Sequence, residues 1–353
     1  MKLKTTAILS ALALSLASCH NPVYDYEGDC EVTYGLRFVY NMNLDWADAF
    51  TTLVNRVNLY AFDSNGVFVK EYLLTEAQTS IPGYTIQLDL PAGDYTLVAW
   101  GALETGVNLI DSFYIPVMTP GVSTLNDLTC QLYTQTNETY PYYSDARLPF
   151  LYQGNMTVTL PNPQDGSYHE YVMYLTKDTN HVRAMIQKVG NDILPEQLDL
   201  TITAANAEMA WNNDLIGDEV VTYLPWNIQP DEITTLPDED GETQTYAGVI
   251  ADFTTSRFTT TMTDGVTLKV YNTDSEKMIF QVPVLQYALT AKNYYVQNYG
   301  KPMDDQEFLD RQSEYFMTFF LDKDLRLLYT IVEVLEWRVV IHNYNVGEPT
   351  VTD

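Results

Sequence analysis

The sequence has few of the residues that build catalytic and metal centres. Its 353 residues include only three cysteines and four histidines. No two histidines stand at the HxxxH or HExxH spacing that binds zinc, and the cysteines form no CxxC pair. A GxSxG elbow, a Walker loop and a GxGxxG fingerprint are also missing. These absences predict a protein that is not an enzyme and that has neither a metal site nor a cofactor.

Basic residues are scarce as well. The chain has 18 Lys and Arg against 47 Asp and Glu, which gives a net charge of −29. A nucleic-acid partner is excluded, because phosphate binding requires a basic face. Adjacent carboxylates such as Asp304 and Asp305 are expected by chance at this acid content, so they do not indicate a glycosidase pair.

Long apolar runs are missing beyond the N-terminus. Lys2 and Lys4 precede an apolar stretch at residues 7–16, which is shorter than the roughly 20 residues of a membrane span. Leu16-Ala17-Ser18-Cys19 follows and resembles the bacterial lipobox, in which the cysteine becomes the acylated N-terminus. We therefore expect a signal peptide at residues 1–18 and a lipid on Cys19, carrying acyl chains such as palmitate.

Two cysteines remain after that processing. Cys30 stands just before the first strand-like run, and Cys130 lies in the last such run of the first domain. An exported protein can form a disulfide, and this one would join the two ends of that domain. Two small buried side chains are the alternative, which the sequence supports equally.

Short runs of alternating polarity predict a β-rich first domain at residues 19–134. Asp63-Ser64-Asn65-Gly66 and Pro91-Ala92-Gly93-Asp94 separate successive runs and predict hairpin turns. A short helix is expected within residues 44–54. The predicted strands are residues 31–40, 57–63, 67–73, 84–90, 95–103 and 128–134.

A polar segment without clear periodicity, residues 135–148, predicts a linker, and Tyr140, Tyr142 and Tyr143 within it could stack on sugars or pack against a domain. A second β-rich domain is expected at residues 149–353. One helix is predicted there, where Pro302 and two acids precede an apolar face of Phe308, Gln312, Tyr315, Phe316 and Phe319. The predicted strands are residues 155–160, 170–175, 183–189, 198–204, 246–253, 267–272, 278–284, 326–334 and 337–344.

The order of these features resembles a known family over nearly the whole chain: the fimbrial anchor and tip-associated lipoproteins of the FimB type. The motifs that carry the resemblance are the lipobox, Tyr24-Asp25-Tyr26-Glu27 with Cys30, Asn41-Met42-Asn43-Leu44 with Ala47-Asp48-Ala49-Phe50, the runs at residues 57–63 and 91–101, and Leu175-Thr176-Lys177-Asp178-Thr179-Asn180.

The resemblance implies a mostly β protein with two tandem transthyretin-like β-sandwich domains. It implies a non-enzymatic lipoprotein of the outer membrane and fimbrium that serves cell adhesion by anchoring or assembling a fimbria. Its partners would be fimbrial shaft or accessory subunits, bound by strand addition. Shaft subunits of this kind are cut at an N-terminal Arg, whereas an anchor keeps its lipid; we therefore expect Arg37 and Arg56 to remain uncut.

The final predicted strand, at residues 337–344, is the candidate partner-facing strand, with Trp337, Val339, Ile341 and Tyr344 alternating along it. Its alternative role is to close the second domain. A surface glycan-binding lipoprotein is the alternative function, with tyrosine and tryptophan rings as stacking platforms.

Overall fold

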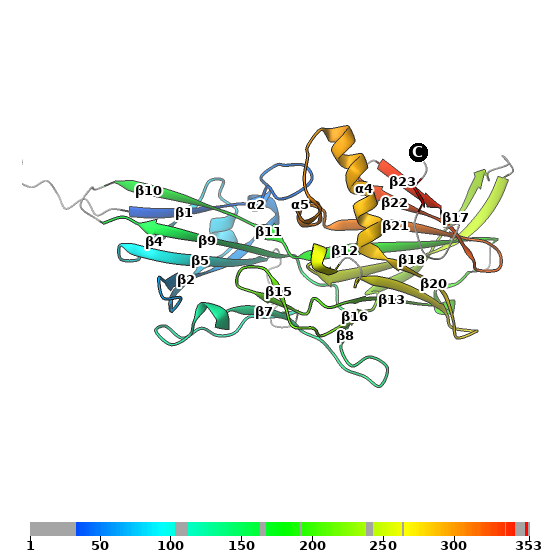
Figure 1. Ribbon diagram of the computed structural model, residues 1–353, viewed down its shortest axis with the longest axis horizontal. Helices are drawn as coiled ribbons and strands as arrows, with labels where there is room; N and C mark the ends of the chain where they lie inside the picture. Colours follow the sequence, from blue (N-terminus) through cyan, green and yellow to red (C-terminus); the bar gives the residue numbers. More distant parts are fainter. Residues whose placement is uncertain are drawn as a thin grey trace, which may run out of the picture.

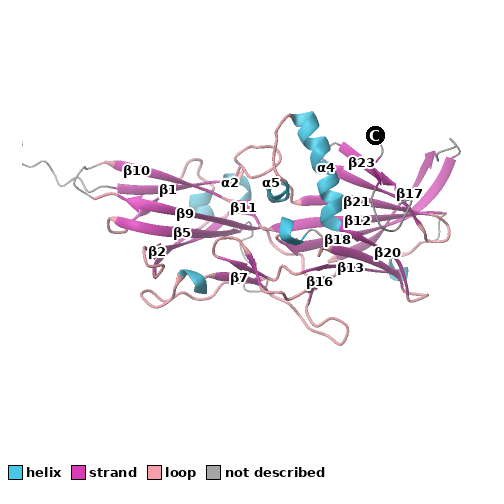
Figure 2. Cartoon of the chain, viewed as in Figure 1, coloured by secondary structure: helices cyan, strands magenta, loops and turns pink. Residues whose placement is uncertain are grey.

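The computed structural model describes residues 33–102, 112–162, 167–190, 193–237, 243–262, 265–335, 337–342 and 350–351. Figure 1 shows an elongated molecule in which two β-rich bodies lie end to end. Strands dominate and helices are few (Figure 2), so the expected mostly β class is confirmed. The predicted signal peptide, Cys19 and Cys30 lie outside the described residues.

The strands run in the following order: β1 Thr33–Val39, β2 Arg56–Asp63, β3 Phe68–Leu74, β4 Thr85–Leu88, β5 Gly93–Ala102, β6 Phe113–Tyr114, β7 Thr129–Leu132, β8 Tyr143–Ser144, β9 Leu151–Leu160, β10 Tyr168–Tyr174, β11 Thr176–Lys177, β12 Thr179–Val189, β13 Leu198–Ala204, β14 Glu208–Ala210, β15 Leu215–Ile216, β16 Val221–Tyr223, β17 Asn227–Pro237, β18 Thr243–Ser256, β19 Thr267–Asn272, β20 Lys277–Pro283, β21 Glu314–Leu321, β22 Leu327–Val334, β23 Trp337–His342 and β24 Thr350–Val351. The α-helices are α2 Phe50–Leu53, α3 Glu76–Thr79, α4 Val284–Tyr299 and α5 Asp305–Arg311.

The first body packs a three-stranded sheet, β10-β1-β4, against a five-stranded sheet, β11-β9-β5-β2-β3. Leu36 of β1 faces Leu59 and Leu97 of the larger sheet in a common core, and all three side chains are fully buried. Alternation along each strand places these side chains on one face, which explains why the runs could be recognised in the sequence.

The five-stranded sheet is buried on both faces. Leu59 and Ala99 point into the first core, whereas Phe62 and Trp100 point into a second core that extends through the other body. A strand covered on both sides needs apolar residues at successive positions, and β5 has such a run at its end. The second core therefore runs continuously from this sheet into the other body.

The second body is a sandwich of a seven-stranded sheet, β17-β18-β12-β21-β22-β23-β24, and a five-stranded sheet, β20-β19-β13-β16-β8. Val182 and Phe253 of the first sheet and Ile202 and Leu268 of the second are fully buried between them. A smaller sheet, β15-β14-β7-β6, lies below the first body in Figure 1 and covers the second face of its central sheet.

The hairpin predicted at residues 63–66 is confirmed. The Asp63 carboxylate accepts hydrogen bonds from the backbone N–H groups of Asn65 and Val67, and Gly66 has a φ of +73°. The hairpin predicted at residues 91–94 is wrong. β4 pairs with β1 in one sheet while β5 pairs with β2 in the other, so this turn crosses between sheets.

The helix predicted from residue 302 is shorter than expected. It ends at Arg311 because Gln312 is extended, and residues 314–321 form β21. Tyr315 and Phe319 point into the core as alternate residues of a strand. A spacing of four residues is compatible with both the helical and the strand period, which is why the sequence pattern predicted a helix here.

Sequence reasoning missed α4, the longest helix of the described chain. Leu285, Ala288, Ala291 and Tyr295 follow helical spacing and are buried, and Gly300 ends the helix in the left-handed conformation. The helix expected within residues 44–54 is limited to the four-residue α2.

Strand pairing crosses residue 149, where the second domain was expected to begin. β9 pairs with β5 along its whole length, and β10 runs parallel to β1. The chain passes from the central sheet of the first body to the seven-stranded sheet at Asp178, the single residue between β11 and β12.

Candidate functional site

The candidate partner-facing strand β23 lies near one edge of the seven-stranded sheet. It pairs with β22 along its length, and β24 covers it only at Ile341 and His342. Val339 and Ile341 are buried in the second core, into which α4 also packs. Trp337 belongs to β23 by its backbone, and Tyr344 lies outside the described residues. The strand therefore closes the second body with one face and leaves most of its outer edge without a partner strand among the described residues.

The other face of this sheet carries a row of aromatic rings. Phe320 and Tyr329 stack with their centroids 4.4 Å apart, and the His342 ring lies 6.1 Å from that of Tyr329. Tyr246 meets Phe320 edge to face at 5.4 Å. Phe320, Tyr329 and His342 come from the neighbouring strands β21, β22 and β23 in register, and Tyr246 of β18 reaches Phe320 across the intervening strand β12.

A polar cluster lies on the same face, nearer the first body. The His181 ring is 3.0 Å from the Glu314 carboxylate through Nδ1 and 3.1 Å from the Asp252 carboxylate through Nε2. Arg183 Nε donates to Asp252 at 2.7 Å. The hydrogen bond to Glu314 and that to Asp252 raise the pKa of His181. Burial by itself would raise the pKa of Asp252, but its hydrogen bonds from Arg183, Asn227 and His181 lower it.

A buried ionic group occupies the passage between the two bodies. Asp178 is fully buried and accepts a hydrogen bond from Asn213 Nδ2 at 2.9 Å, and Arg257 Nε lies 3.6 Å from the same carboxylate. Arg257 also donates to Asp310 at 2.7 Å. Burial raises the pKa of Asp178 to about 7, because the Arg257 charge compensates only part of the desolvation.

Beside this group, a tryptophan fastens the first body to the helices of the second. The Trp46 indole donates to the Tyr295 hydroxyl of α4 at 3.0 Å, and the Arg311 guanidinium lies 3.4 Å from the indole centroid. Arg311 also donates to the carbonyls of Asn41 and Asn43. Cation–π contact and main-chain hydrogen bonds thus hold the two bodies in one orientation.

Lys177 adds a third junction contact. Its ammonium lies 3.7 Å from the Phe150 ring centroid and donates to Ser313 Oγ at 3.1 Å. Burial lowers the pKa of Lys177 to about 8. The run Leu175 to Asn180, which was recognised in the sequence, therefore contains two of the residues that join the bodies, Lys177 and Asp178.

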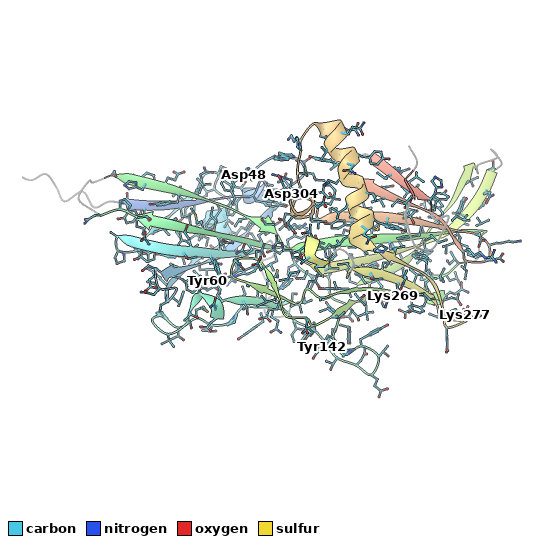
Figure 3. All side chains as sticks on the ribbon, viewed as in Figure 1. Asp48, Tyr60, Tyr142, Lys269, Lys277 and Asp304 are labelled. Carbon is cyan, nitrogen blue, oxygen red and sulfur yellow. The ribbon has the colours of Figure 1, made fainter. Side chains whose placement is uncertain are left out.

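The tyrosines of the expected linker lie on the opposite side of the molecule from α4. Figure 3 shows Tyr142 on the loop below the second body, and its side chain is 40% exposed. Tyr140 and Tyr143 contact each other with centroids 6.3 Å apart. Nearby, the exposed Arg147 guanidinium lies over the Trp226 indole at 5.0 Å.

Cys130 is fully buried in the second core, and that burial raises the pKa of its thiol well above the usual value. Cys130 lies in β7, and its partner across the ladder is Met209 of β14. Among the described residues no group of three or more His, Cys, Asp or Glu could hold a metal ion. No described helix is long and apolar enough to cross a membrane.

Comparison with known proteins identifies relatives over most of the chain. A family model described as fimbrillin-A associated anchor proteins Mfa1 and Mfa2 matches residues 26–343. The minor fimbrium anchoring subunit Mfa2 of Porphyromonas gingivalis is 24% identical over 297 residues, which are 82% of this chain and 81% of that protein.

Solved structures share the fold. A candidate adhesin from Bacteroides thetaiotaomicron superposes with a TM-score of 0.70 at 28% identity, covering 88% of this chain and 97% of that one. A candidate polysaccharide-binding protein of the same species superposes with a TM-score of 0.69 at 26% identity, covering 86% of this chain and 96% of that one. The fimbrial anchor protein Mfa2 of P. gingivalis superposes with a TM-score of 0.59 at 18% identity, covering 88% of this chain and 99% of that one. This similarity shows a common fold.

Proposed function

The chain belongs to the family of fimbrillin-A associated anchor proteins, and from this premise we propose that it is an outer-membrane lipoprotein that holds a fimbria at the cell surface. The family match over residues 26–343 carries the proposal, because it includes both bodies and the junction. The lipid on Cys19 supplies the attachment to the membrane, and fimbrial shaft or accessory subunits are the partners.

The junction supports a mechanical role. An anchor is pulled from both ends, so force has to pass from the first body to the second. Three separate contacts span the passage: Asp178 with Arg257, Trp46 with Tyr295, and Lys177 with Ser313. Buried charges that lose their partner are costly, which opposes separation of the two bodies.

We propose further that the chain is divided into two transthyretin-like sandwich domains that meet at Asp178, after a first domain that includes β9 and β10. A fimbrial subunit adds a strand to the outer edge of β23. Main-chain groups at an uncovered sheet edge are available for such pairing, and β24 covers only two residues of it.

The proposal predicts that the chain keeps its N-terminus. Arg37 lies inside β1 and its guanidinium is 3.2 Å from the Glu170 carboxylate of β10, so proteolysis there requires unpairing of the strand. Recovery from the cell surface of a mature chain that lacks residues 19–37 would contradict the proposal.

Anchoring is tested by replacing Cys19→Ala and measuring fimbriae in the culture medium. We expect fimbriae to be shed while the same number of subunits is produced. A pull-down of the wild-type protein from intact cells should recover a fimbrillin-like subunit. Deletion of residues 345–353 with unchanged fimbrial retention would exclude a role of that terminal segment.

Glycan binding is the second candidate function. The stacked pair of Arg147 and Trp226 and the exposed Tyr142 favour it, because sugars bind on aromatic faces beside polar groups. A glycan array probed with wild-type protein and Trp226→Ala tests it. Signals that do not depend on Trp226 would refute this site.

A further inference from the structure

A pocket of about 310 Å³ lies where the two bodies meet, next to the polar cluster of the seven-stranded sheet. One wall is the loop that precedes α2, and the other comes from the end of α5, the start of β21 and the end of β22. The lining residues are Asn43, Leu44, Asp45, Arg311, Gln312, Ser313, Glu314, Phe316, Glu333 and Leu335.

Leu335, which lines the pocket after the end of β22, has a strained backbone conformation. Its φ is +51°, in the left-handed region where a non-glycine residue is disfavoured by about 1–2 kcal/mol. Val334 pairs with Trp337, so Leu335 is in a two-residue hairpin connection, where Asn or Gly is the usual choice.

Packing among the described residues does not account for this leucine. Its side chain is 47% exposed and belongs to neither core, whereas Leu325, the other leucine with positive φ, packs against the second core. A strained residue retained at the mouth of a pocket indicates that the side chain itself is needed there.

The charges of the pocket indicate what it receives. Leu44, Phe316 and Leu335 supply apolar surface, and the carboxylates of Asp45, Glu314 and Glu333 surround it. Arg311 is the only basic residue of the lining, and its charge is already paired with Glu307. Glu333 is paired with Arg338 and Glu314 with His181, so Asp45 is the lining carboxylate that has no cationic partner among the described residues. An occupant with an apolar group and a positive charge therefore complements the pocket.

We propose that this pocket receives an aliphatic or aromatic side chain from an extended segment of a fimbrial subunit, with a Lys or Arg of the same segment against the Asp45 carboxylate. The inference rests on the proposed function and specifies the chemistry of its partner. A sugar fits less well, because the apolar lining is largely aliphatic and offers little surface for ring stacking.

The first test uses the full-length protein and fimbrial shaft subunit purified from the same cells. Leu335→Asn removes the apolar group but suits a positive φ, so we expect equal or higher thermal stability together with at least about tenfold weaker subunit binding. Leu328→Asn is the matched control, since Leu328 is 42% exposed on β22, the strand that Leu335 follows, and does not line the pocket. It should bind as the wild type does.

The second test defines the partner segment. A photo-crosslinking amino acid at position 45 in intact cells should join to an apolar residue that has Lys or Arg within two positions, and the same amino acid at position 328 should not. Asp45→Asn should weaken binding about threefold and reduce its dependence on salt.

The outcomes separate the two proposals. If the wild type binds the subunit but Leu335→Asn binds equally well and position 45 gives no crosslink, the pocket inference is wrong and anchoring stands. A crosslink to a second copy of this chain also overturns the inference. If the wild type neither binds the subunit nor retains fimbriae, the proposed function itself fails.

Discussion

The central sheet of the first body and the seven-stranded sheet of the second differ in how many of their faces are enclosed. The first, β11-β9-β5-β2-β3, is covered by apolar cores on both sides. The second has a core on one side and, on the other, partly exposed side chains that include His181, Arg183 and Phe316. A doubly covered sheet has no face left for recognition. The second sheet retains a face and an edge for partners.

The largest expected effect comes from Trp100, at the centre of the enclosed sheet. Trp100→Ala should lower the free energy of unfolding by about 3–5 kcal/mol, because the fully buried ring leaves a cavity. Phe316→Ala on the partly exposed face should cost only about 1 kcal/mol. Urea denaturation followed by circular dichroism measures both. Equal losses would contradict the distinction between the sheets.

Asp178, where one sheet passes into the other, should show the next largest effect. Its pKa is raised from 3.8 to about 7 in the folded protein, so folding retains a proton that the unfolded chain releases. The contribution of this group to stability is therefore complete below about pH 4 and is lost as the pH rises to about 7. Asp178→Asn, which resembles the protonated acid, should unfold with a weaker pH dependence. At pH 8 it should be more stable than the wild type by roughly 2 kcal/mol.

Asp252 provides the control of opposite sign. Its lowered pKa contributes stability that is present above pH 3.8 and lost as the pH falls further. Asp252→Asn should therefore destabilise the protein at neutral pH, where Asp178→Asn does not. If both variants lose stability at pH 8, Asp178 acts as an ordinary ion-pair partner of Arg257.

Substitution of two glycines by alanine compares how well the two sheets tolerate added side-chain volume. A Cβ on Gly154 would lie 2.8 Å from the Tyr174 carbonyl oxygen, which belongs to the backbone of the first body. Gly154→Ala should cost about 1–3 kcal/mol. A Cβ on Gly248 would lie 2.6 Å from Gln187 Nε2, at the far end of a flexible side chain, but also 2.7 Å from Asp231 Cβ, which moves only with the β17 backbone. Gly248→Ala should therefore cost a similar amount, and a much smaller loss in thermal unfolding would show that the β17 edge of the second sheet yields to the added volume.

The smallest effect is expected at His181 on the partly exposed face. Because its pKa is raised, the contribution of the charged ring is present at low pH and is lost as the pH rises through the folded value. His181→Gln should cost about 0.5–1 kcal/mol at pH 5.5, after allowance for solvent screening, and less at pH 8. A cost that stays constant between these pH values would mean that the ring acts through packing.

Much of the strand content could be read from local pattern. The turn at residues 63–66 uses an Asp and a Gly whose chemistry favours a tight turn, so the hairpin between β2 and β3 was predictable. Residues 314–321 were not, since aromatic residues at four-residue spacing suit a helix or a strand until packing decides. The junction was found only in part: the run around Asp178 was recognised, but its partners Arg257 and Asp310 are distant in the chain.

The sequence by itself determined the β-rich class, the family and the scarcity of catalytic groups, because each depends on composition or on motifs within a few residues. Only the tertiary structure decided which strands pair, that β9 and β10 complete the first body, and that Asp178, Trp46 and Lys177 join the two bodies. The same holds for the strain at Leu335 and the pocket beside it. Such contacts depend on burial and on pairing between residues that are far apart in the sequence, and no local sequence pattern indicates which of these residues will meet.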